Sequence, residues 1–445
     1  MADLAVNSFG QAPIYDSTNG DRNKLAVEDK SFHDWYRFVL SYPPHLVREY
    51  IADFNLKADD LVLDPFCGTG TTVVEAKLQG IRSLGLEANR FAQFAGNVKV
   101  DWTINARYLR EVGRRIHEEV ISRLCNHGLP DDPLDHPRIL RSGLQRFTDE
   151  QAKLILKNSI SPIPLHKTLV LLDEIDRYDG VSVHKYLRLA LAKTVVFRVS
   201  NLKFGPEVGV GKPKEDVAVA GAWLAELHQI CDDLEAVDPT AYPEARVLLS
   251  DSRNLGPALQ GTQVSAVITS PPYPNEKDYT RTTRLESVLL GFVNDKSDLR
   301  EMKKTLLRSN TRGVYVADDD DRYVEHIAEV QDIATKIEEK RLELGKTSGF
   351  ERMYARLTKL YFGGMAKHLK ELQQVLKPGA MLAYVVGDQA SYLRVMIRTG
   401  QLLEQIAVDL GYEKVRIDQF RTRFSTATKE WLNEEVVVLR WPGRK

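Results

Sequence analysis

The sequence predicts an α/β protein in which a doubly wound, mostly parallel sheet of seven strands carries long insertions. One indication is a set of short apolar runs, most of which end in a polar residue or a turn. Another is the order of elements around the first run, where a Gly-containing turn, a helix-like stretch and a second apolar run follow in succession. We expect strands at residues 61–63, 82–86, 246–250, 265–269, 381–386, 412–417 and 435–440.

Two long stretches separate these runs and divide the chain into parts. We expect a lead-in with the first two strands, a mostly helical insertion, a short return to the sheet, a second insertion and a C-terminal part of the core, at residues 1–99, 100–244, 245–280, 281–352 and 353–445. The second insertion carries the acidic run 318–321 and an alternating-charge helix at 325–344, which we expect to be solvated or to pack on the surface.

Composition excludes several classes of protein. The chain has 445 residues, 43% hydrophobic and 28% charged, so it can bury a full core without disulfides or a metal. Its three cysteines form no Cys-x-x-Cys pair and its ten histidines show no ligand spacing, so we assign no metal. No apolar run approaches the roughly 20 residues of a membrane span, and the N-terminus lacks the layout of a signal peptide. We therefore expect a cytoplasmic protein without a membrane partner.

The net charge of −1 excludes a uniformly basic nucleic-acid-binding protein, so any such surface must be local. Residues 138–214 contain 14 Lys or Arg against 7 Asp or Glu. This segment is the candidate basic surface, and the alternative is an ordinary solvated helical face.

The segment LVLDPFCGTGTT, residues 61–72, combines a strand, an acidic residue, a Gly-x-Gly turn and the start of a helix. Gly68 and Gly70 allow the backbone to approach a ligand closely. The free N–H groups at the start of the helix suit an anionic group such as an amino-acid carboxylate. A loop for a nucleotide triphosphate is disfavoured because no lysine follows Gly70.

Two further acids stand at the ends of predicted strands. Glu87 ends the second strand, where a carboxylate in this fold class reaches the two hydroxyls of a bound ribose. Asp251 ends a later strand, where it is placed to accept a hydrogen bond from an adenine amino group. Each acid taken alone is also explained as a helix cap or a surface residue.

A second motif, VITSPPYPNEKDYT at residues 267–280, is more specific. Pro271 and Pro272 remove two backbone donors and stiffen the turn after the strand. The groups left exposed are the Ser270 hydroxyl, the Pro271 carbonyl and the Tyr273 ring. These groups suit a planar base that carries an amino group, and the alternative is a Pro-Pro turn whose tyrosine packs on the core.

With both motifs the chain resembles the DNA amino-methyltransferases, which methylate exocyclic amines with S-adenosylmethionine on a Rossmann-like seven-stranded sheet. Residues 64–72 are similar to their cofactor motif. Residues 269–273 are similar to their catalytic motif, in the Ser-Pro-Pro-Tyr form that is most typical of cytosine-N4 enzymes. The implied cofactor residues are Asp64, Phe66, Gly68, Gly70, Thr71, Thr72, Glu87 and Asp251, and the implied catalytic residues are Ser270, Pro271, Pro272 and Tyr273.

The resemblance implies site-specific methyl transfer to the N4 amine of cytosine in double-stranded DNA. It also implies a restriction-modification system, whose restriction endonuclease would act separately. The alternatives are an adenine-N6 DNA methyltransferase, an RNA base methyltransferase and a catalytically silent DNA-binding protein on the same fold. Only 60 residues precede the Gly-containing loop, which argues against the RNA enzymes, and the intact motifs argue against a silent protein.

Reaction in duplex DNA requires base flipping, because the target amine cannot meet the cofactor inside the base stack. Tyr273 is the first candidate for stacking on the flipped base, and Phe424 is the second. Basic and amide side chains are the candidates for binding the DNA itself. They are Arg198, Asn201, Lys203, Lys212 and Lys214 in the basic insertion, with Arg281 after the catalytic motif.

Overall fold

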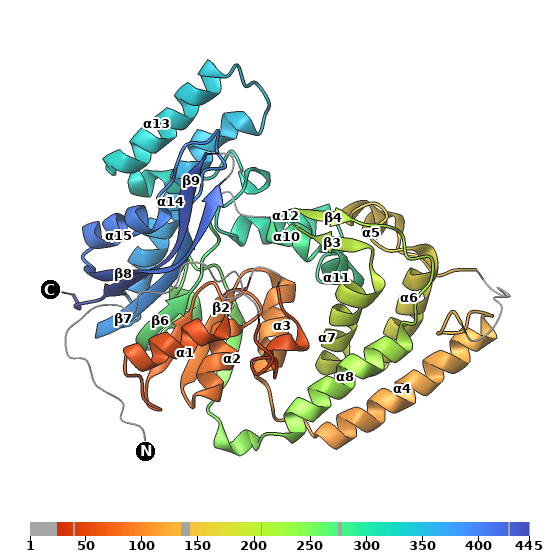
Figure 1. Cartoon of the computed structure of the whole chain (residues 1–445). Coiled ribbons are helices and arrows are strands. Elements are labelled where there is room, and N and C mark those ends of the chain that lie inside the picture. Colours follow the sequence, from red (N-terminus) through yellow and green to blue (C-terminus); the bar gives the residue numbers. More distant parts are fainter. Residues whose placement is uncertain are drawn as a thin grey trace.

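The computed structural model describes residues 25–38, 41–134, 143–205, 207–274, 278–425 and 428–444. At its centre lies a seven-stranded sheet with the order β5-β2-β1-β6-β7-β9-β8 (Figure 1). The first five of these strands pair in parallel, and β9 pairs antiparallel with both β7 and β8. This mostly parallel sheet confirms the predicted fold class. The strands are β1 (Leu61–Asp64), β2 (Arg82–Glu87), β5 (Ala245–Leu249), β6 (Val264–Thr269), β7 (Leu376–Gly387), β8 (Glu413–Ser425) and β9 (Glu430–Arg440).

The strand order reverses between β1 and β6, the two strands that precede the Gly-containing loop and the Ser-Pro-Pro-Tyr motif. In doubly wound sheets, the chain leaves two such neighbouring strands toward opposite faces of the sheet. A crevice therefore opens at the carboxyl ends of these strands. The parallel register pairs Leu63 with Val267, so the two motifs follow side by side. The fold therefore brings together two segments that lie about 200 residues apart in the chain.

Helices cover both faces of the sheet because neighbouring strand residues point to opposite sides. Val62 belongs to the apolar cluster on the side of α1 and α2, whereas Leu63 belongs to the cluster on the side of α14 and α15. The helices around the sheet are α1 (Pro44–Asp53), α2 (Thr71–Leu78), α3 (Arg90–Val100), α9 (Gly256–Leu259), α14 (Tyr354–Leu372) and α15 (Thr399–Asp409).

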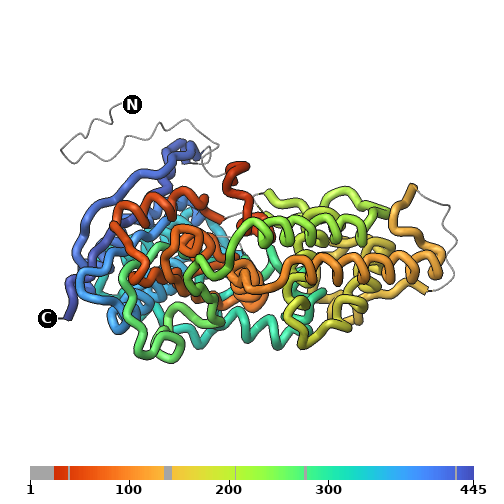
Figure 2. Tube along the Cα trace, turned by 90° about the horizontal axis from the view of Figure 1, so that it is seen from below, coloured from red at the N-terminus to blue at the C-terminus, as the bar shows by residue number. Residues whose placement is uncertain are grey.

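The first insertion forms a helical arm beside the sheet (Figures 1 and 2). Its apolar core is continuous with that of the sheet, because Phe91 of α3 and Val247 of β5 share one cluster with Leu187 and Trp223 of the arm. The arm contains α4 (Ala106–Asn126), α5 (Asp149–Leu154), α6 (Pro162–Asp176), α7 (His184–Thr194), the π-helical turn η2 (Val195–Val199), β3 (Leu202–Phe204), β4 (Val208–Val210) and α8 (Ala220–Glu235).

The second insertion contains short helices and one long one. The long helix, α13, packs on α14 through Val330, Ala334 and Ile337, so the predicted helix at 325–344 is a packing helix. The elements are α10 (Tyr279–Thr282), α11 (Arg284–Leu289), α12 (Lys296–Thr305) and α13 (Ala328–Glu343), with 3-10 turns η4 (Thr311–Gly313), η5 (Asp320–Val324) and η6 (Glu351–Met353). Two further 3-10 turns are η1 (His33–Trp35) and η3 (Pro239–Ala241). No helix in the described ranges is long and apolar enough to cross a membrane.

The strands differ from the sequence prediction at three places, the first being β7, which begins at Leu376 rather than at residue 381. The final hairpin is longer than expected, since β8 extends to Ser425 and β9 begins at Glu430. A small hairpin, β3–β4, was not expected at all. It forms because Leu202 and Phe204 pack against the core of the arm, a contact that local propensity does not reveal.

The N-terminus of α8, in the arm, is capped by a side chain from a distant part of the chain. The N-cap residue of α8, Val219, has no capping side chain. Instead, Asp131 accepts hydrogen bonds from the backbone N–H groups of Val219, Ala220 and Gly221, at 2.8, 3.0 and 3.0 Å. The Asp131 carboxylate therefore joins the end of α4 to the start of α8.

We expect Asp131→Ala to lower the free energy of unfolding by about 1–3 kcal/mol, because three N–H groups, two of them buried, lose their acceptor. Denaturant titration measures the effect. Asp132→Ala is the matched control, since the neighbouring side chain is exposed and should cost less than about 0.5 kcal/mol. Equal losses in the two variants would contradict the capping role.

Candidate active site at the carboxyl edge of the sheet

A pocket opens at the carboxyl ends of β1, β2, β5 and β6, where the strand order reverses. Its lining comes from the lead-in before α1, the Gly-containing loop, the ends of β2 and β5, the Ser-Pro-Pro-Tyr motif with α10, and residues 303–313 of the second insertion. Of the residues predicted to form the site, those that line it are Phe66, Gly68, Thr71, Glu87, Ser270 and Pro272. One pocket therefore joins the predicted cofactor and catalytic motifs.

The loop after β1 has left-handed backbone at both glycines. Gly68 and Gly70 have φ values of +53° and +90°, which residues with a Cβ rarely adopt. A Cβ on Gly70 would also lie 3.2 Å from the Cα of Gly96 in α3. Gly70 therefore lets the loop turn tightly into α2, while Gly68 faces the pocket.

Asp64 and Thr72 lie behind the pocket and join its two motifs. Asp64 Oδ1 accepts a hydrogen bond of 2.6 Å from the Thr269 hydroxyl at the end of β6. Thr72 Oγ1 donates to the carbonyl of Ile268 at 3.1 Å. Burial raises the pKa of Asp64 to about 6. Both side chains are fully buried, so in this structure they hold the loop to the catalytic strand.

Glu87 lies at the end of β2 and faces the pocket. Its two carboxylate oxygens accept hydrogen bonds from the backbone N–H groups of Gly68 and Asn89, at 2.8 and 2.7 Å. Burial raises the pKa of Glu87 to about 7. The carboxylate thus fixes the Gly-containing loop and keeps lone pairs that can accept from a ligand.

The catalytic motif splits between the pocket and the sheet behind it. Ser270 lines the pocket, and its hydroxyl donates to the carbonyl of Val385 at 3.1 Å, which leaves the oxygen able to accept. The Tyr273 ring packs on Gly387, where a Cβ would lie 2.6 Å from the ring. Among the described residues, Pro271 and Tyr273 are outside the pocket lining.

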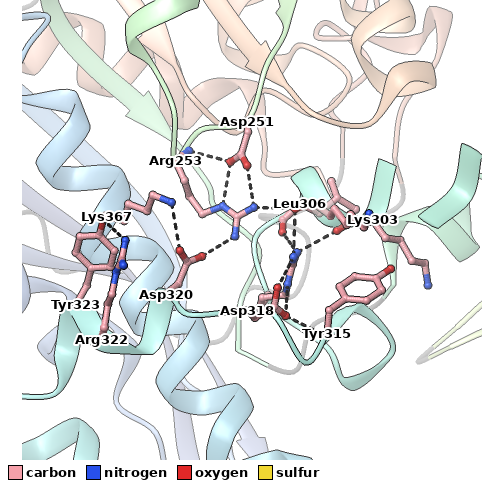
Figure 3. Close-up of polar contacts among 12 residues, drawn as sticks. Asp251, Arg253, Lys303, Leu306, Tyr315, Asp318, Asp320, Arg322, Tyr323 and Lys367 are labelled. Atoms are coloured by element: carbon pink, nitrogen blue, oxygen red, sulfur yellow. Dashed lines mark hydrogen bonds and ion pairs between the residues drawn. The ribbon is translucent and has the colours of Figure 1, made fainter. Parts of the chain in front are cut away.

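Asp251 has a partner that the sequence did not indicate. Its two carboxylate oxygens accept from Arg253 Nε at 3.0 Å and from Arg253 Nη2 at 2.8 Å (Figure 3). The neighbours Ser250 and Ser252, rather than Asp251, line the pocket. A contact between Asp251 and a cofactor stays a prediction, and it would require the carboxylate to share its lone pairs with Arg253.

Lys99 is a site residue that sequence reasoning missed. It is 1% exposed, and its ammonium donates to the carbonyls of Thr69 and Tyr36 at 2.8 and 3.2 Å. Burial lowers its pKa to about 7. Lys99, which belongs to α3, therefore supports the Gly-containing loop through the carbonyl of Thr69. A lone lysine on an otherwise ordinary helix gives no sequence signal for this role.

The residues predicted to bind DNA have different surroundings. Lys203 and Lys212 are exposed on the β3–β4 hairpin and its flank, and Arg198 reaches Glu226 Oε1 at 3.3 Å. Lys214 donates to the carbonyl of Arg198 at 2.6 Å. Exposed Lys203 and Lys212 remain the best-placed of these side chains to meet a phosphate.

Asn201 is buried, and its hydrogen bonds hold the β3–β4 hairpin in place. Its amide donates to the Asn158 carbonyl and to Ser161 Oγ, and its side-chain oxygen accepts from Lys214 N. It is 3% exposed, so a base contact would require these bonds to break. The geometry counts against the predicted role of Asn201 in DNA recognition.

The remaining predicted contacts lie outside the pocket lining. Arg281 is half-buried on α10, and its Nε has no hydrogen-bond partner among the described residues. Phe424 is 50% exposed on the β8–β9 hairpin, where its ring meets that of Trp431 at 5.4 Å between centroids. Within the described ranges, no group of three or more His, Cys, Asp or Glu residues is arranged to hold a metal ion.

Comparisons with known proteins point to one family. Residues 15–94 match the N6/N4 methyltransferase family model, described as DNA methylase. The type II methyltransferase M.BsoBI of Geobacillus stearothermophilus is 27% identical over 448 residues, which cover 93% of this chain and 85% of that protein. M.AvaI of a Nostoc species, also a type II methyltransferase, is 22% identical over 410 residues, which cover 88% of this chain and 81% of that protein.

Among solved structures, TrmN from Thermus thermophilus is 11% identical with a TM-score of 0.30, and the match spans 93% of this chain and 52% of that one. The fold assignment therefore rests on the strand order of this chain. The matches to the family model and to the two type II enzymes extend over the Gly-containing loop, and the two enzymes match most of the chain. These matches confirm that the chain resembles the DNA amino-methyltransferases.

Proposed function

We propose that this protein is a site-specific DNA methyltransferase that transfers a methyl group from S-adenosylmethionine to the N4 amine of cytosine in double-stranded DNA. The observation that carries the proposal is the shared pocket. Gly68 and Glu87 line one part of it and Ser270 lines another. A methyl donor and an acceptor amine bound at these positions would meet within a single site, as a direct transfer requires.

The residues on the loop side of the pocket fit S-adenosylmethionine. Glu87 offers a half-buried carboxylate that can accept from ribose hydroxyls. The Phe66 ring, which packs edge-on against His368 at 4.9 Å between centroids, provides an apolar wall. Gly68 leaves room for close approach at the start of α2, whose free N–H groups suit a carboxylate.

When bound, S-adenosylmethionine supplies a methyl group already activated by the positive sulfur. The chain must then orient the amine, whose lone pair is delocalised into the base. Ser270 Oγ and the Pro271 carbonyl would accept hydrogen bonds from the amine and draw it toward a tetrahedral geometry. Tyr273 would stack on the flipped base with its ring face. Positioning thus supplies most of the catalysis, and no covalent intermediate with the enzyme is needed.

The choice of cytosine over adenine rests on Ser270, since the Ser-Pro-Pro-Tyr form is most typical of cytosine-N4 enzymes. Adenine-N6 methylation is the main alternative, and methylation of an RNA base is a weaker one. A restriction-modification role is supported by the names of M.BsoBI and M.AvaI, which are type II methyltransferases. The cognate restriction endonuclease would be a separate protein that shares the DNA site.

Cofactor binding should depend on the ionisation of Glu87. Its pKa is about 7, and the ionised carboxylate is the better acceptor for ribose hydroxyls. We expect calorimetric affinity for S-adenosylmethionine to rise as pH increases from 6 to 8. Glu87→Gln should weaken binding by about tenfold or more, because charged hydrogen bonds are lost.

Glu87→Gln should also lose this part of the pH dependence. Lys99 titrates in the same range, with a pKa of about 7, so the difference between wild type and Glu87→Gln isolates the carboxylate. An identical pH profile in the two proteins would argue against the ribose contact.

Ser270→Ala should remove one acceptor and slow methyl transfer on the order of 10²-fold, with cofactor and DNA binding retained. Tyr273→Ala should weaken capture of the flipped base by about 1–3 kcal/mol, and Tyr273→Phe should do much less because it keeps the ring face. Single-turnover kinetics measure both effects. Full activity of the double variant Ser270→Ala/Tyr273→Ala would refute the catalytic site.

Mass spectrometry of nucleosides from methylated DNA identifies the base. We expect N4-methylcytosine and no N6-methyladenine. Finding N6-methyladenine instead would refute the base assignment and leave the amino-methyltransferase chemistry intact. A product found only with RNA substrates would refute the DNA assignment.

DNA binding should weaken as salt increases, because each neutralised phosphate releases counterions. Charge reversal of Lys203 and Lys212 should flatten the plot of log affinity against log salt by about 1 for each lysine. Reversal of Lys336 and Lys346, which are exposed on and after α13, is the control and should leave the slope unchanged. A flatter slope after reversal of Lys336 and Lys346, with no change after reversal of Lys203 and Lys212, would place the DNA on the second insertion.

A further inference from the structure

The second insertion contributes a pocket wall, which we define as residues 303–310. All of its members except Lys304 line the same pocket as Gly68 and Ser270. Its first three residues end α12, and residues 306–310 lead from this helix to the turn η4 without a strand or helix to fix them. Its position must therefore come from contacts with the rest of the chain.

Arg253 is the first of these contacts. It follows β5 and is 6% exposed. Its guanidinium binds both oxygens of Asp251, donates to Asp320 Oδ2 at 2.6 Å and donates to the carbonyl of Lys304 at 3.0 Å (Figure 3). One planar group thus joins the end of a sheet strand to two points of the second insertion.

Arg308 is the second contact and belongs to the wall itself. It is 4% exposed and forms a two-point ion pair with Asp318, at 2.8 Å for each bond. Its remaining N–H groups donate to the carbonyls of Lys303, Lys304 and Leu306. Arg253 and Arg308 therefore share one acceptor, the carbonyl of Lys304, and fold the wall around it.

Two glycines of α14, Gly363 and Gly364, form a notch that contacts both η5 and the pocket wall. A Cβ on Gly363 would lie 1.9 Å from the carbonyl oxygen of Asp320, and a Cβ on Gly364 would lie 2.5 Å from Leu307 Cδ1. Only glycine fits at either position without displacing its neighbour. The notch therefore contacts Asp320, which binds Arg253, and Leu307, which lines the pocket. These contacts do not depend on the ion pairs.

The wall is also tied to the catalytic side. Lys303 donates to Asp278 Oδ2 at 2.8 Å, and Asp278 caps α10 just beyond the Ser-Pro-Pro-Tyr motif. The pocket wall is therefore anchored to the end of β5, to α14 and to the catalytic segment. Buried ion pairs add little net stability because desolvation opposes their attraction, so their effect here is to fix geometry.

We infer that Arg253 and Arg308 are positioning residues of the active site, which hold the pocket wall in the place that the methyl donor requires. The inference rests on the proposed function. It gives the second insertion a role in cofactor binding, and it assigns the acidic residues Asp318 and Asp320 to that role as counter-ions of the two arginines.

Arg253→Lys and Arg308→Lys test the inference because lysine keeps the charge but lacks the planar fork. One ammonium cannot reach all the acceptors that each guanidinium binds. We expect the dissociation constant for S-adenosylmethionine and its KM to rise about tenfold. The turnover at saturating cofactor should stay near that of the wild type, because Ser270 and Tyr273 are untouched.

Gly364→Ala probes the wall without changing any charge. Its methyl group should displace Leu307 into the pocket and raise the same dissociation constant on the order of tenfold. Gly221→Ala is the matched control, a helical glycine whose added Cβ would meet only Asp131 Oδ2 at 3.7 Å. It should leave cofactor binding unchanged.

The outcomes separate the two proposals. Failure of the wild-type protein to bind S-adenosylmethionine would refute the proposed function and this inference with it. Wild-type binding with unchanged affinity in the folded variants Gly364→Ala and Arg308→Lys would overturn the inference alone, even if their melting temperatures fall. If an arginine variant does not fold, Gly364→Ala decides. Higher KM with retained turnover would support the positioning role.

Discussion

The hydrogen bond between Asp64 and Thr269 is the constraint on which the site depends. It joins the carboxyl ends of β1 and β6, the two strands between which the sheet order reverses. The bond is fully buried, and burial raises the pKa of Asp64 to about 6, so desolvation of the carboxylate must be offset by its hydrogen bonds. A second link, from Thr72 to the carbonyl of Ile268, keeps the same register. Both motifs can serve one pocket because these buried bonds leave them no freedom to move apart.

Features that depend on local sequence were predicted well. All seven strands of the main sheet were expected near their observed places, because most of them are apolar runs that end in a polar residue or a turn. The Gly-containing loop could also be recognised, since Gly68 and Gly70 adopt the left-handed backbone that the turn requires. Phe66, Glu87 and Ser270 line the pocket as the motifs suggested. Their placement follows from strand ends and turns, which a few consecutive residues specify.

Features that depend on which partner a side chain binds could not be predicted. Asp251 looked like a ligand-facing acid, but its carboxylate binds Arg253. Asn201 looked like a base-reading amide in a basic loop, but it holds a hairpin together from inside. The acidic run at 318–321 gave no sign of a buried partner, yet Asp320 is 5% exposed beside Arg253. Asn201 and Asp320 have partners far away in the chain, whereas Asp251 binds an arginine only two residues on, and there the sequence does not show where the side chain points.

Apolar packing and directional hydrogen bonds both attach the two insertions to the core. The helical arm continues the apolar cluster of the sheet through Leu187 and Trp223, and apolar burial stabilises without fixing exact directions. The second insertion is held near the pocket by Arg253 and Arg308, whose planar guanidinium groups accept only a few arrangements of their partners. The arm has directional contacts as well, since Asp233 of α8 accepts hydrogen bonds from the N–H of Phe32 and from Trp35 Nε1, at 3.1 and 2.7 Å. A segment that shapes a pocket needs contacts with fixed directions, and the guanidinium groups of Arg253 and Arg308 provide them for residues 303–310.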